Sequence, residues 1–260
     1  MGHETIRYER RDDGIAIVTL DRPRRLNAIN RIVLTELDAV LDEIEADDAV
    51  RVFLLTGAPR PDGRPCFSAG FDLKSIAEGI LPERGLGQRV TDRLDDLLKP
   101  SIAVVDGVCS TGGGELAMAA DLRVVGSNLE LSDWHLKNLG TGLGEWGAAT
   151  RWARLAGSQK AKEVMLTGRV LGAAEAVSCG WAIAAHPSEQ LMDAALEMAR
   201  AIAGMNPKGV RMTLLHLDRT EDMTREQSLR WSLELPRLVG IRTAIEEKAD
   251  AVLGKVRKEK

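Results

Sequence analysis

The sequence predicts an α/β fold over residues 1–188, followed by a helical region over residues 189–260. Short runs of β-branched and apolar residues alternate with segments of helical periodicity as far as about residue 188, which is typical of an α/β layer fold. Beyond that point only the helical pattern continues, up to a charged end. A chain of 260 residues, 44% of them hydrophobic, is long enough to bury a full core.

Four runs predict buried strands, because each is short and rich in β-branched or apolar residues. They are IAIVTL at 15–20, VRVFLLTG at 50–57, SIAVVDGV at 101–108 and LRVVG at 122–126. Between the second and third runs, residues 57–70 are rich in Gly, Pro and Arg and predict a loop.

Helices are predicted where apolar residues recur every three or four positions. These segments are 33–47, a charged stretch over about 83–99 that stops before Pro100, and 189–204. The last segment has an apolar stripe that a body of this size is not expected to cover alone, so contact with another subunit is predicted. The stripe consists of Leu191, Ala194, Ala195, Met198 and Ile202.

Composition excludes several classes of protein. No run of about 18 apolar residues predicts a membrane span, and the charged N-terminus MGHETIRYERRDDG lacks the apolar core of a secretory signal. The three cysteines, Cys66, Cys109 and Cys179, lack metal-ligand spacing and fit reduced thiols, so a cytoplasmic protein without a metal site is expected. A formal net charge of −4 argues against nucleic acid as a partner.

The segment STGGGELAMAAD at 110–121 is the strongest candidate for a functional site. It follows a predicted strand and opens a helix near Thr111 or Gly112, where the first backbone amides have no intrahelical acceptor. Glycines let a ligand oxygen approach those amides closely. Glu115 is the only acid in an otherwise apolar helix, so it is expected to be buried. A buried acid beside free backbone amides predicts a site that stabilises an oxyanion and transfers a proton. The alternative is a carboxylate that only complements the helix dipole.

Four motifs, in order, resemble the enoyl-CoA hydratase/isomerase, or crotonase, superfamily. They are LDRPRRLNAIN at 20–30, CFSAGFDLK at 66–74, VDGVCSTGGGELAMAADLRV at 105–124 and RWARLAGSQKAKEVMLTGRVLGAAEAVSCGWA at 151–182. Together they extend over most of the chain. The resemblance implies a spiral of ββα units and a helical C-terminal region that forms a homotrimer or a dimer of trimers.

The resemblance also implies a coenzyme A thioester as substrate and no permanently bound cofactor. The thioester oxygen would lie between the amides of Phe71 and Gly112, and Glu115 matches the first of the two catalytic glutamates of the hydratases. Residues that match positions near the CoA nucleotide are Arg24 and Lys74 for the phosphates, and Ala69 and Leu73 for the adenine.

The second glutamate of the hydratases has no counterpart in this sequence. The position falls within LELSDWHLKNLGTGLGEWGAATRW at 129–152. Alignment from the N-terminal side of this segment places it on His135, and alignment from the C-terminal side places it on Leu136. Two extra residues and a new acid, Glu145, occur in the same segment. Glu145 could restore the pair, or His135 could act as a base oriented by Glu145, with a pH–rate limb near the usual histidine pKa of about 6.5.

The sequence therefore predicts an acyl-CoA-processing enzyme, nominally a hydratase or isomerase. Because no acid matches the second position, hydration of crotonyl-CoA is expected to be slow or undetectable. One alternative is a hydrolase or retro-Claisen C–C lyase that uses His135. Another is a non-catalytic, RNA-binding protein with this fold, which the net charge disfavours.

Overall fold

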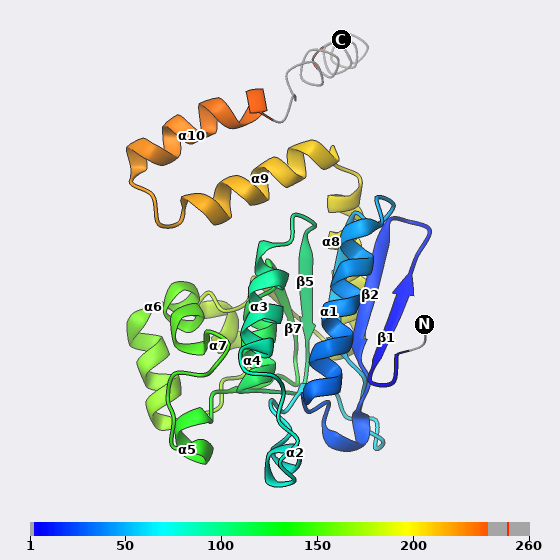
Figure 1. Cartoon of the computed structure of the whole chain (residues 1–260), viewed down its shortest axis with the longest axis vertical. Helices are drawn as coiled ribbons and strands as arrows, with labels where there is room; N and C mark the ends of the chain where they lie inside the picture. The colour runs from blue at the N-terminus through cyan, green and yellow to red at the C-terminus, as the bar shows by residue number, and fades with distance from the viewer. Residues whose placement is uncertain (1–2, 239–248, 250–260) are drawn as a thin grey trace. The chain divides into compact units, whose positions relative to one another are not determined.

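The computed structural model describes residues 3–238 and 249 (Figure 1). The chain divides into two compact units, of which the first ends at Ala203 and the second begins at Gly204. The second unit contains α9 (Pro207–Thr220) and α10 (Arg225–Leu238), and Asn206 caps α9 by accepting hydrogen bonds from the amides of Lys208 and Gly209. Within the described part of the chain, no helix has both the length and the apolar character needed to cross a membrane.

The first unit contains two β-sheets. Their strands are β1 (Ile6–Arg10), β2 (Ile15–Leu20), β3 (Val52–Gly57), β4 (Cys66–Ser68), β5 (Ser101–Val105), β6 (Val108–Ser110), β7 (Leu122–Gly126), β8 (Glu130–Ser132) and β9 (Ala184–His186). The larger sheet has the order β1-β2-β3-β5-β7-β9, and only its β1–β2 pair is antiparallel. The smaller sheet is parallel and has the order β4-β6-β8.

Successive strands alternate between the two sheets, and this alternation produces a spiral of ββα units. The pairs β3–β4, β5–β6 and β7–β8 each give one strand to each sheet, and each is followed by a short helix. These helices are α2 (Leu73–Ala77), α4 (Gly112–Met118) and α5 (His135–Leu139). The predicted α/β spiral is therefore confirmed, and its repetition brings the starts of α4 and α5 to neighbouring strand ends.

The predicted strand at 101–108 is in fact two strands, β5 and β6, in different sheets. The chain turns at Gly107, whose φ is +62°. A Cβ at this position would lie 2.0 Å from the carbonyl oxygen of Pro65, so only glycine fits. The predicted strands at 15–20 and 122–126 match β2 and β7.

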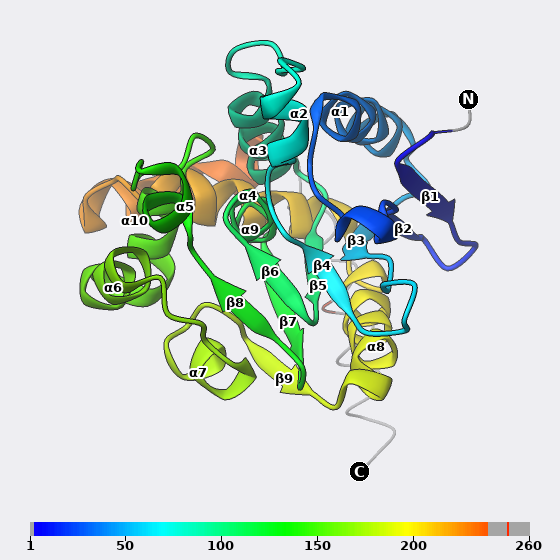
Figure 2. The ribbon, with the colours of Figure 1, turned by 90° about the horizontal axis from the view of Figure 1, so that it is seen from below.

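Helices cover both faces of the larger sheet, because alternate residues of a strand point to opposite faces. Val52 and Leu54 pack in one apolar cluster with α8 (Leu191–Ala203), whereas Phe53 and Leu55 pack in the other cluster with α1 (Arg31–Ala46). Figure 2 shows α1 and α8 on opposite sides of β3. The remaining helices of the unit are α3 (Leu86–Asp96), α6 (Ala148–Thr167), α7 (Ala173–Ser178) and the 3-10 helices η1 (Pro23–Arg25) and η2 (Ser188–Gln190).

Helix α8 corrects one prediction made from the sequence. It lies in the first compact unit, which ends at Ala203, whereas the sequence analysis divides the chain at residue 188. Leu191 and Ala195 are buried against the strands of the larger sheet, and Met198 and Ile202 pack beside them. The apolar stripe of α8 is therefore covered by this chain's own sheet and gives no reason to expect another subunit there.

Arg123 binds two backbone carbonyls at the end of α4 and a third at Trp181. Its side chain, in a residue that is 5% exposed, donates to the carbonyl oxygens of Trp181, Met118 and Ala120. A charged donor is well suited to carbonyls at the C-terminal end of a helix. The position of α4 therefore depends on a guanidinium buried at the start of β7.

We expect Arg123→Met to lower the free energy of unfolding by about 2–4 kcal/mol, because three buried carbonyls lose their donor. Urea unfolding followed by circular dichroism measures this. The control is Arg169→Met, which removes ion pairs to Glu163 and Glu175 from a side chain that is 39% exposed and should cost about 1 kcal/mol or less. Equal losses for the two variants would contradict a special role of Arg123.

Candidate active site

The first unit contains a cavity of about 680 Å³ at the starts of α4 and α5. The catalytic and oxyanion candidates named from the sequence all line it: Phe71, Gly112, Glu115, His135 and Glu145. Its other walls come from the segment between α2 and α3, the first turn of α3 and the loop between α5 and α6.

Two segments from different ββα units meet at the proposed oxyanion site. A Cβ on Gly70 would lie 3.1 Å from the amide nitrogen of Gly112, and the Thr111 hydroxyl donates to the carbonyl oxygen of Ala69 at 3.4 Å. Gly112 is the first residue of α4, so its amide has no intrahelical acceptor. The bridge between Ile29 and Phe71 uses the carbonyl of Gly70 and the amide of Asp72, and it leaves the amide of Phe71 out.

Thr111 has an unusual backbone conformation for a residue that is not glycine. Its φ is 46° and its ψ is −119°. Such conformations cost of order 1–3 kcal/mol and are kept where the surrounding structure determines them. Here the conformation directs the chain from β6 into α4 and puts Gly112 beside Gly70.

Glu115 is 1% exposed, and its two carboxylate oxygens have different partners. Oε1 accepts hydrogen bonds from the backbone amides of Trp146 at 2.8 Å and Ala148 at 3.0 Å. These amides lie at the N-terminus of α6, so Glu115 caps a helix other than its own and complements its dipole. Oε2 lies 3.4 Å from Nε2 of His135. One oxygen is thus used for structure and the other faces an ionisable group.

The loop before α6 closes over Glu115 because it contains glycine at the closest point. A Cβ on Gly144, whose φ is +69°, would lie 2.3 Å from Oε1 of Glu115 and 2.6 Å from Cβ of Ala148. Any side chain at this position would therefore displace the carboxylate or the start of α6.

His135 begins α5 and is 7% exposed. Its ring lies between two carboxylates, because Nδ1 is 3.0 Å from Oδ1 of Asp133 and Nε2 faces Glu115. The same oxygen of Asp133 accepts the backbone amide of His135 at 3.2 Å. Asp133 is itself 2% exposed. A buried cluster of one imidazole and two carboxylates results.

The pKa of His135 is raised by this arrangement. Burial alone would lower it, but hydrogen bonds with Asp133 and Glu115, together with their charges, raise it from 6.5 to about 10. His135 is therefore an imidazolium at neutral pH. The two carboxylates therefore favour a pH–rate limb above the value of about 6.5 that was expected from the sequence.

The expected pairing of His135 with Glu145 is wrong. Glu145 lines the same cavity but is exposed, and among the described residues it forms no hydrogen bond or ion pair. The acid that pairs with His135 through Nδ1 is Asp133. The sequence analysis missed Asp133. The signal that could have found it is an Asp two residues before a histidine, a spacing at which an Asp side chain can accept the backbone amide of the later residue.

Trp146 forms a wall of the cavity that the sequence did not predict. Its ring is wedged between two helices, since a Cβ on Gly87 of α3 would lie 2.0 Å from its Nε1 and a Cβ on Gly112 of α4 would lie 2.7 Å from its Cζ3. It also packs edge-to-face on Phe71 with ring centroids 6.0 Å apart. The residue is 6% exposed, so the indole sets the space available beside the oxyanion amides.

The four residues matched to the CoA nucleotide lie outside the cavity lining. Arg24 lies in η1 and is exposed, and Leu73 is 51% exposed. Lys74 is also exposed and forms an ion pair with Glu78 at 3.5 Å. Ala69 is half-buried next to Gly70. Their role in binding CoA stays a prediction.

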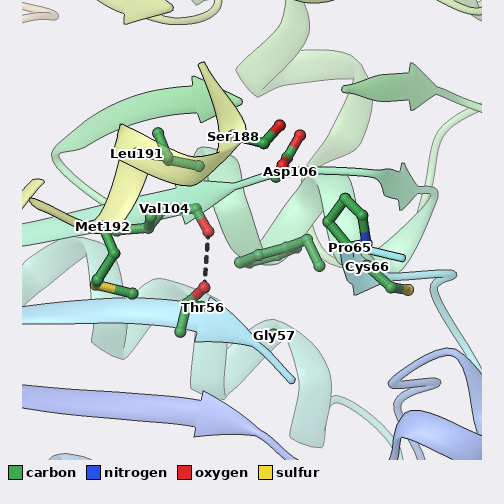
Figure 3. A pocket seen from close by; sticks show the side chains of 10 residues that line it. Thr56, Gly57, Pro65, Cys66, Val104, Asp106, Ser188, Leu191 and Met192 are labelled. Carbon is green, nitrogen blue, oxygen red and sulfur yellow. Dashed lines mark hydrogen bonds between the residues drawn. The ribbon is translucent and has the colours of Figure 1, made fainter. Parts of the chain in front are cut away.

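A second cavity of about 160 Å³ lies at the carboxyl ends of β3 and β5 (Figure 3). Its polar groups are already bonded: Thr56 donates to the carbonyl oxygen of Val104 at 3.0 Å, and Asp106 accepts the amides of Gly107 and Asn128. Burial raises the pKa of the Cys66 thiol to about 11, which keeps it unreactive at neutral pH. This cavity therefore offers no acid–base pair.

The larger cavity thus brings Phe71 and Gly112 together beside a buried contact between a carboxylate and an imidazole. The sequence matches the family described as enoyl-CoA hydratase/isomerase over residues 10–245. The chain belongs to this family, and the resemblance to the crotonase superfamily is confirmed. It is an acyl-CoA-processing enzyme of that superfamily, and the exact reaction is left open by the match.

Individual relatives agree with this assignment. The chain is 35% identical over 210 residues to a short-chain-enoyl-CoA hydratase of Clostridium acetobutylicum, covering 79% of this chain and 78% of that one. The crystal structure of an enoyl-CoA hydratase from Bacillus anthracis superimposes with a TM-score of 0.88 at 26% identity and covers 97% of each chain. A monofunctional enoyl-CoA isomerase from M. smegmatis gives a TM-score of 0.73 at 30% identity and covers 86% of this chain and 98% of its own.

The contact between Trp146 and α4 predicts different effects for two neighbouring glycines. Neither Gly112 nor Gly114 has a positive φ, and nothing lies within 4 Å of a Cβ on Gly114. Gly114→Ala should therefore raise the free energy of unfolding by about 0.5–1 kcal/mol, whereas Gly112→Ala should lower it by about 1–3 kcal/mol by overpacking against the indole.

Urea unfolding of the two variants measures this difference. Adding Trp146→Ala to Gly112→Ala should reduce the loss expected from the two single variants. Equal stability of Gly112→Ala and Gly114→Ala would show that the indole does not pack on Gly112.

Proposed function

We propose that this enzyme catalyses the reversible addition of water to a 2-enoyl-CoA thioester, with Glu115 as general base and His135 as general acid. The contact of 3.4 Å between Oε2 of Glu115 and Nε2 of His135, inside the cavity lined by Phe71 and Gly112, is the observation that carries the proposal. The name of the 35% identical relative, a short-chain-enoyl-CoA hydratase, supports the same substrate class.

Each group has one task in this reaction. Glu115 takes a proton from water while the oxygen of the water adds to the β-carbon of the enoyl group. The electron pair moves onto the thioester oxygen, where the amides of Phe71 and Gly112 stabilise the negative charge that develops. His135 then gives the proton on Nε2 to the α-carbon.

The slow hydration expected from the sequence depended on the missing second carboxylate. The raised pKa of His135 supports a different assignment, in which an imidazolium supplies the proton that a carboxylic acid would otherwise supply. The same property disfavours the retro-Claisen alternative, because a general base must be free of its proton before the reaction begins. Arg24 and Lys74 are exposed and could meet the CoA phosphates, with Ala69 and Leu73 against the adenine.

The test is the turnover of crotonyl-CoA by the wild-type enzyme, by Glu115→Gln and by His135→Gln. Each substitution keeps the size of a polar side chain and removes the proton-transfer group, so we expect kcat to fall about 10²–10⁴-fold in each variant. Binding of acetoacetyl-CoA, measured by calorimetry, should stay within a few-fold of wild type.

Other substrates separate this reaction from its alternatives. Turnover of a 3-enoyl-CoA without hydration of crotonyl-CoA would make the enzyme an isomerase, and turnover only of a β-diketone thioester would make it a C–C lyase. Either result, or wild-type hydration by Glu115→Gln, would overturn the proposal.

We also propose that α9 and α10 contribute to an interface between copies of this chain, and that the assembly is a trimer or a dimer of trimers. Four leucines of these helices are more than half exposed: Leu217 (61%), Leu229 (51%), Leu233 (71%) and Leu238 (70%). Repeated exposure of large apolar side chains on one helix pair is typical of an interaction surface. The residues beyond 238 that the sequence assigned to this region lie, except for 249, outside the described residues.

Light scattering should give the mass of a trimer or a hexamer at micromolar concentration. Leu233→Glu should shift the mass towards the monomer, because it places a charge in the proposed interface. The control is Leu166→Glu in α6, where the leucine is 68% exposed and should leave the assembly intact. A wild-type monomer, or dissociation by the control alone, would contradict the proposal.

A further inference from the structure

Asp133 has no task in the reaction described above, yet it is the most closely bound neighbour of His135. It is 2% exposed and lies between the end of β8 and the start of α5. We propose that Asp133 is a positioning residue that aims Nε2 of His135 at Glu115 and keeps the reaction's proton on the imidazole. This proposal rests on the proposed function, in which His135 is the acid.

The geometry fixes the ring in two ways. Oδ1 of Asp133 accepts the backbone amide of His135 at 3.2 Å and lies 3.0 Å from Nδ1 of its ring. The main chain and the side chain of His135 are therefore held by one atom. Because Nδ1 must donate to a carboxylate, Nε2 is the nitrogen that faces the cavity, 3.4 Å from Oε2 of Glu115.

The charges of the cluster explain why the proton stays on His135. Two buried carboxylates close to each other are costly unless a positive charge lies between them. Asp133 and Glu115 are the charged groups that face the ring, from the end of β8 and from α4. Glu83, Arg84 and Glu145 line other walls of the same cavity. One proton on the imidazole leaves the cluster with a net charge of −1.

This arrangement also closes the proton balance of one turnover. His135 loses a proton to the α-carbon, and Glu115 gains one from water. The two groups are then a neutral imidazole and a carboxylic acid in contact. The proton returns from Oε2 of Glu115 to Nε2 of His135 across the 3.4 Å contact. Asp133 favours this return because its charge stabilises the imidazolium and not the neutral ring.

The test uses Asp133→Asn, which keeps the shape and a carbonyl acceptor for Nδ1 but removes the charge. The alkaline limb of kcat reports loss of the proton from His135, so activity is high below its pKa and falls above it. Removing an opposite charge within hydrogen-bond distance should move that limb downward by about one to three pH units. With a wild-type pKa of about 10, we expect kcat at pH 10 to fall at least about fivefold and KM to change less than threefold.

A second readout does not depend on activity. The chain has four histidines, so ¹⁵N-labelled imidazole signals can be followed by NMR, with His135→Gln assigning the signal of interest. In the wild type His135 should stay protonated above pH 8, and in Asp133→Asn it should lose its proton at lower pH. The control is Asp62→Asn, the same change at an exposed ion pair with Arg64, which should move neither readout.

The outcomes separate this inference from the proposed function. An unchanged NMR titration in Asp133→Asn would overturn the role of Asp133 whatever the activity. If the titration of His135 shifts but the alkaline limb of kcat does not, His135 is not the general acid. That result would overturn the proposed role of Asp133 in catalysis. A shifted titration in an enzyme that does not hydrate crotonyl-CoA would refute the proposed function and leave the electrostatic role of Asp133 supported.

Discussion

The buried carboxylate of Glu115 is the constraint on which the rest of this structure depends. A carboxylate at 1% exposure needs partners for its charge, and here Oε1 takes two backbone amides from the start of α6. These two hydrogen bonds join α4 to α6. They also hold the loop between α5 and α6 in place, and this loop passes over the carboxylate at Gly144. The same loop carries Trp146, whose ring forms the wall beside Gly112. One charged group thus holds the loop that forms a wall of the cavity and also places a carboxylate oxygen beside His135.

The alternation of strands between two sheets explains why the site forms where it does. Each ββα unit ends a strand of the smaller sheet at the start of a short helix, so α4 and α5 begin near each other. Short helices have few hydrogen bonds of their own, and they are held by buried side chains such as Arg123 at the end of α4. The spiral therefore supplies adjacent helix starts, and the side chains at those starts decide what the site can do.

Local sequence patterns predicted those parts of the fold that local physics determines. The strands at 15–20 and 122–126 were found because the runs are short and rich in β-branched and apolar residues, and Glu115 was found because no polar face could carry it into water. The break of 101–108 into two strands was missed, since it depends on how close Gly107 comes to Pro65 in space. The packing of α8 on the larger sheet was missed for the same reason. The topology of the chain, and not the apolar stripe itself, decides which surface the stripe packs against.

The pairing at His135 shows that the sequence alone does not reveal which acid contacts a histidine. The sequence analysis paired His135 with Glu145, but that acid is exposed, whereas Asp133 is held in an Asx turn that brings it to Nδ1 of the ring. The result also changes which atom stores the proton. Two glutamates keep it as a carboxylic acid, while an imidazole between two carboxylates keeps it as a cation, and both clusters carry the same net charge. A histidine at the position that matches the second glutamate of the hydratases therefore keeps the net charge of the cluster unchanged only because Asp133 is present.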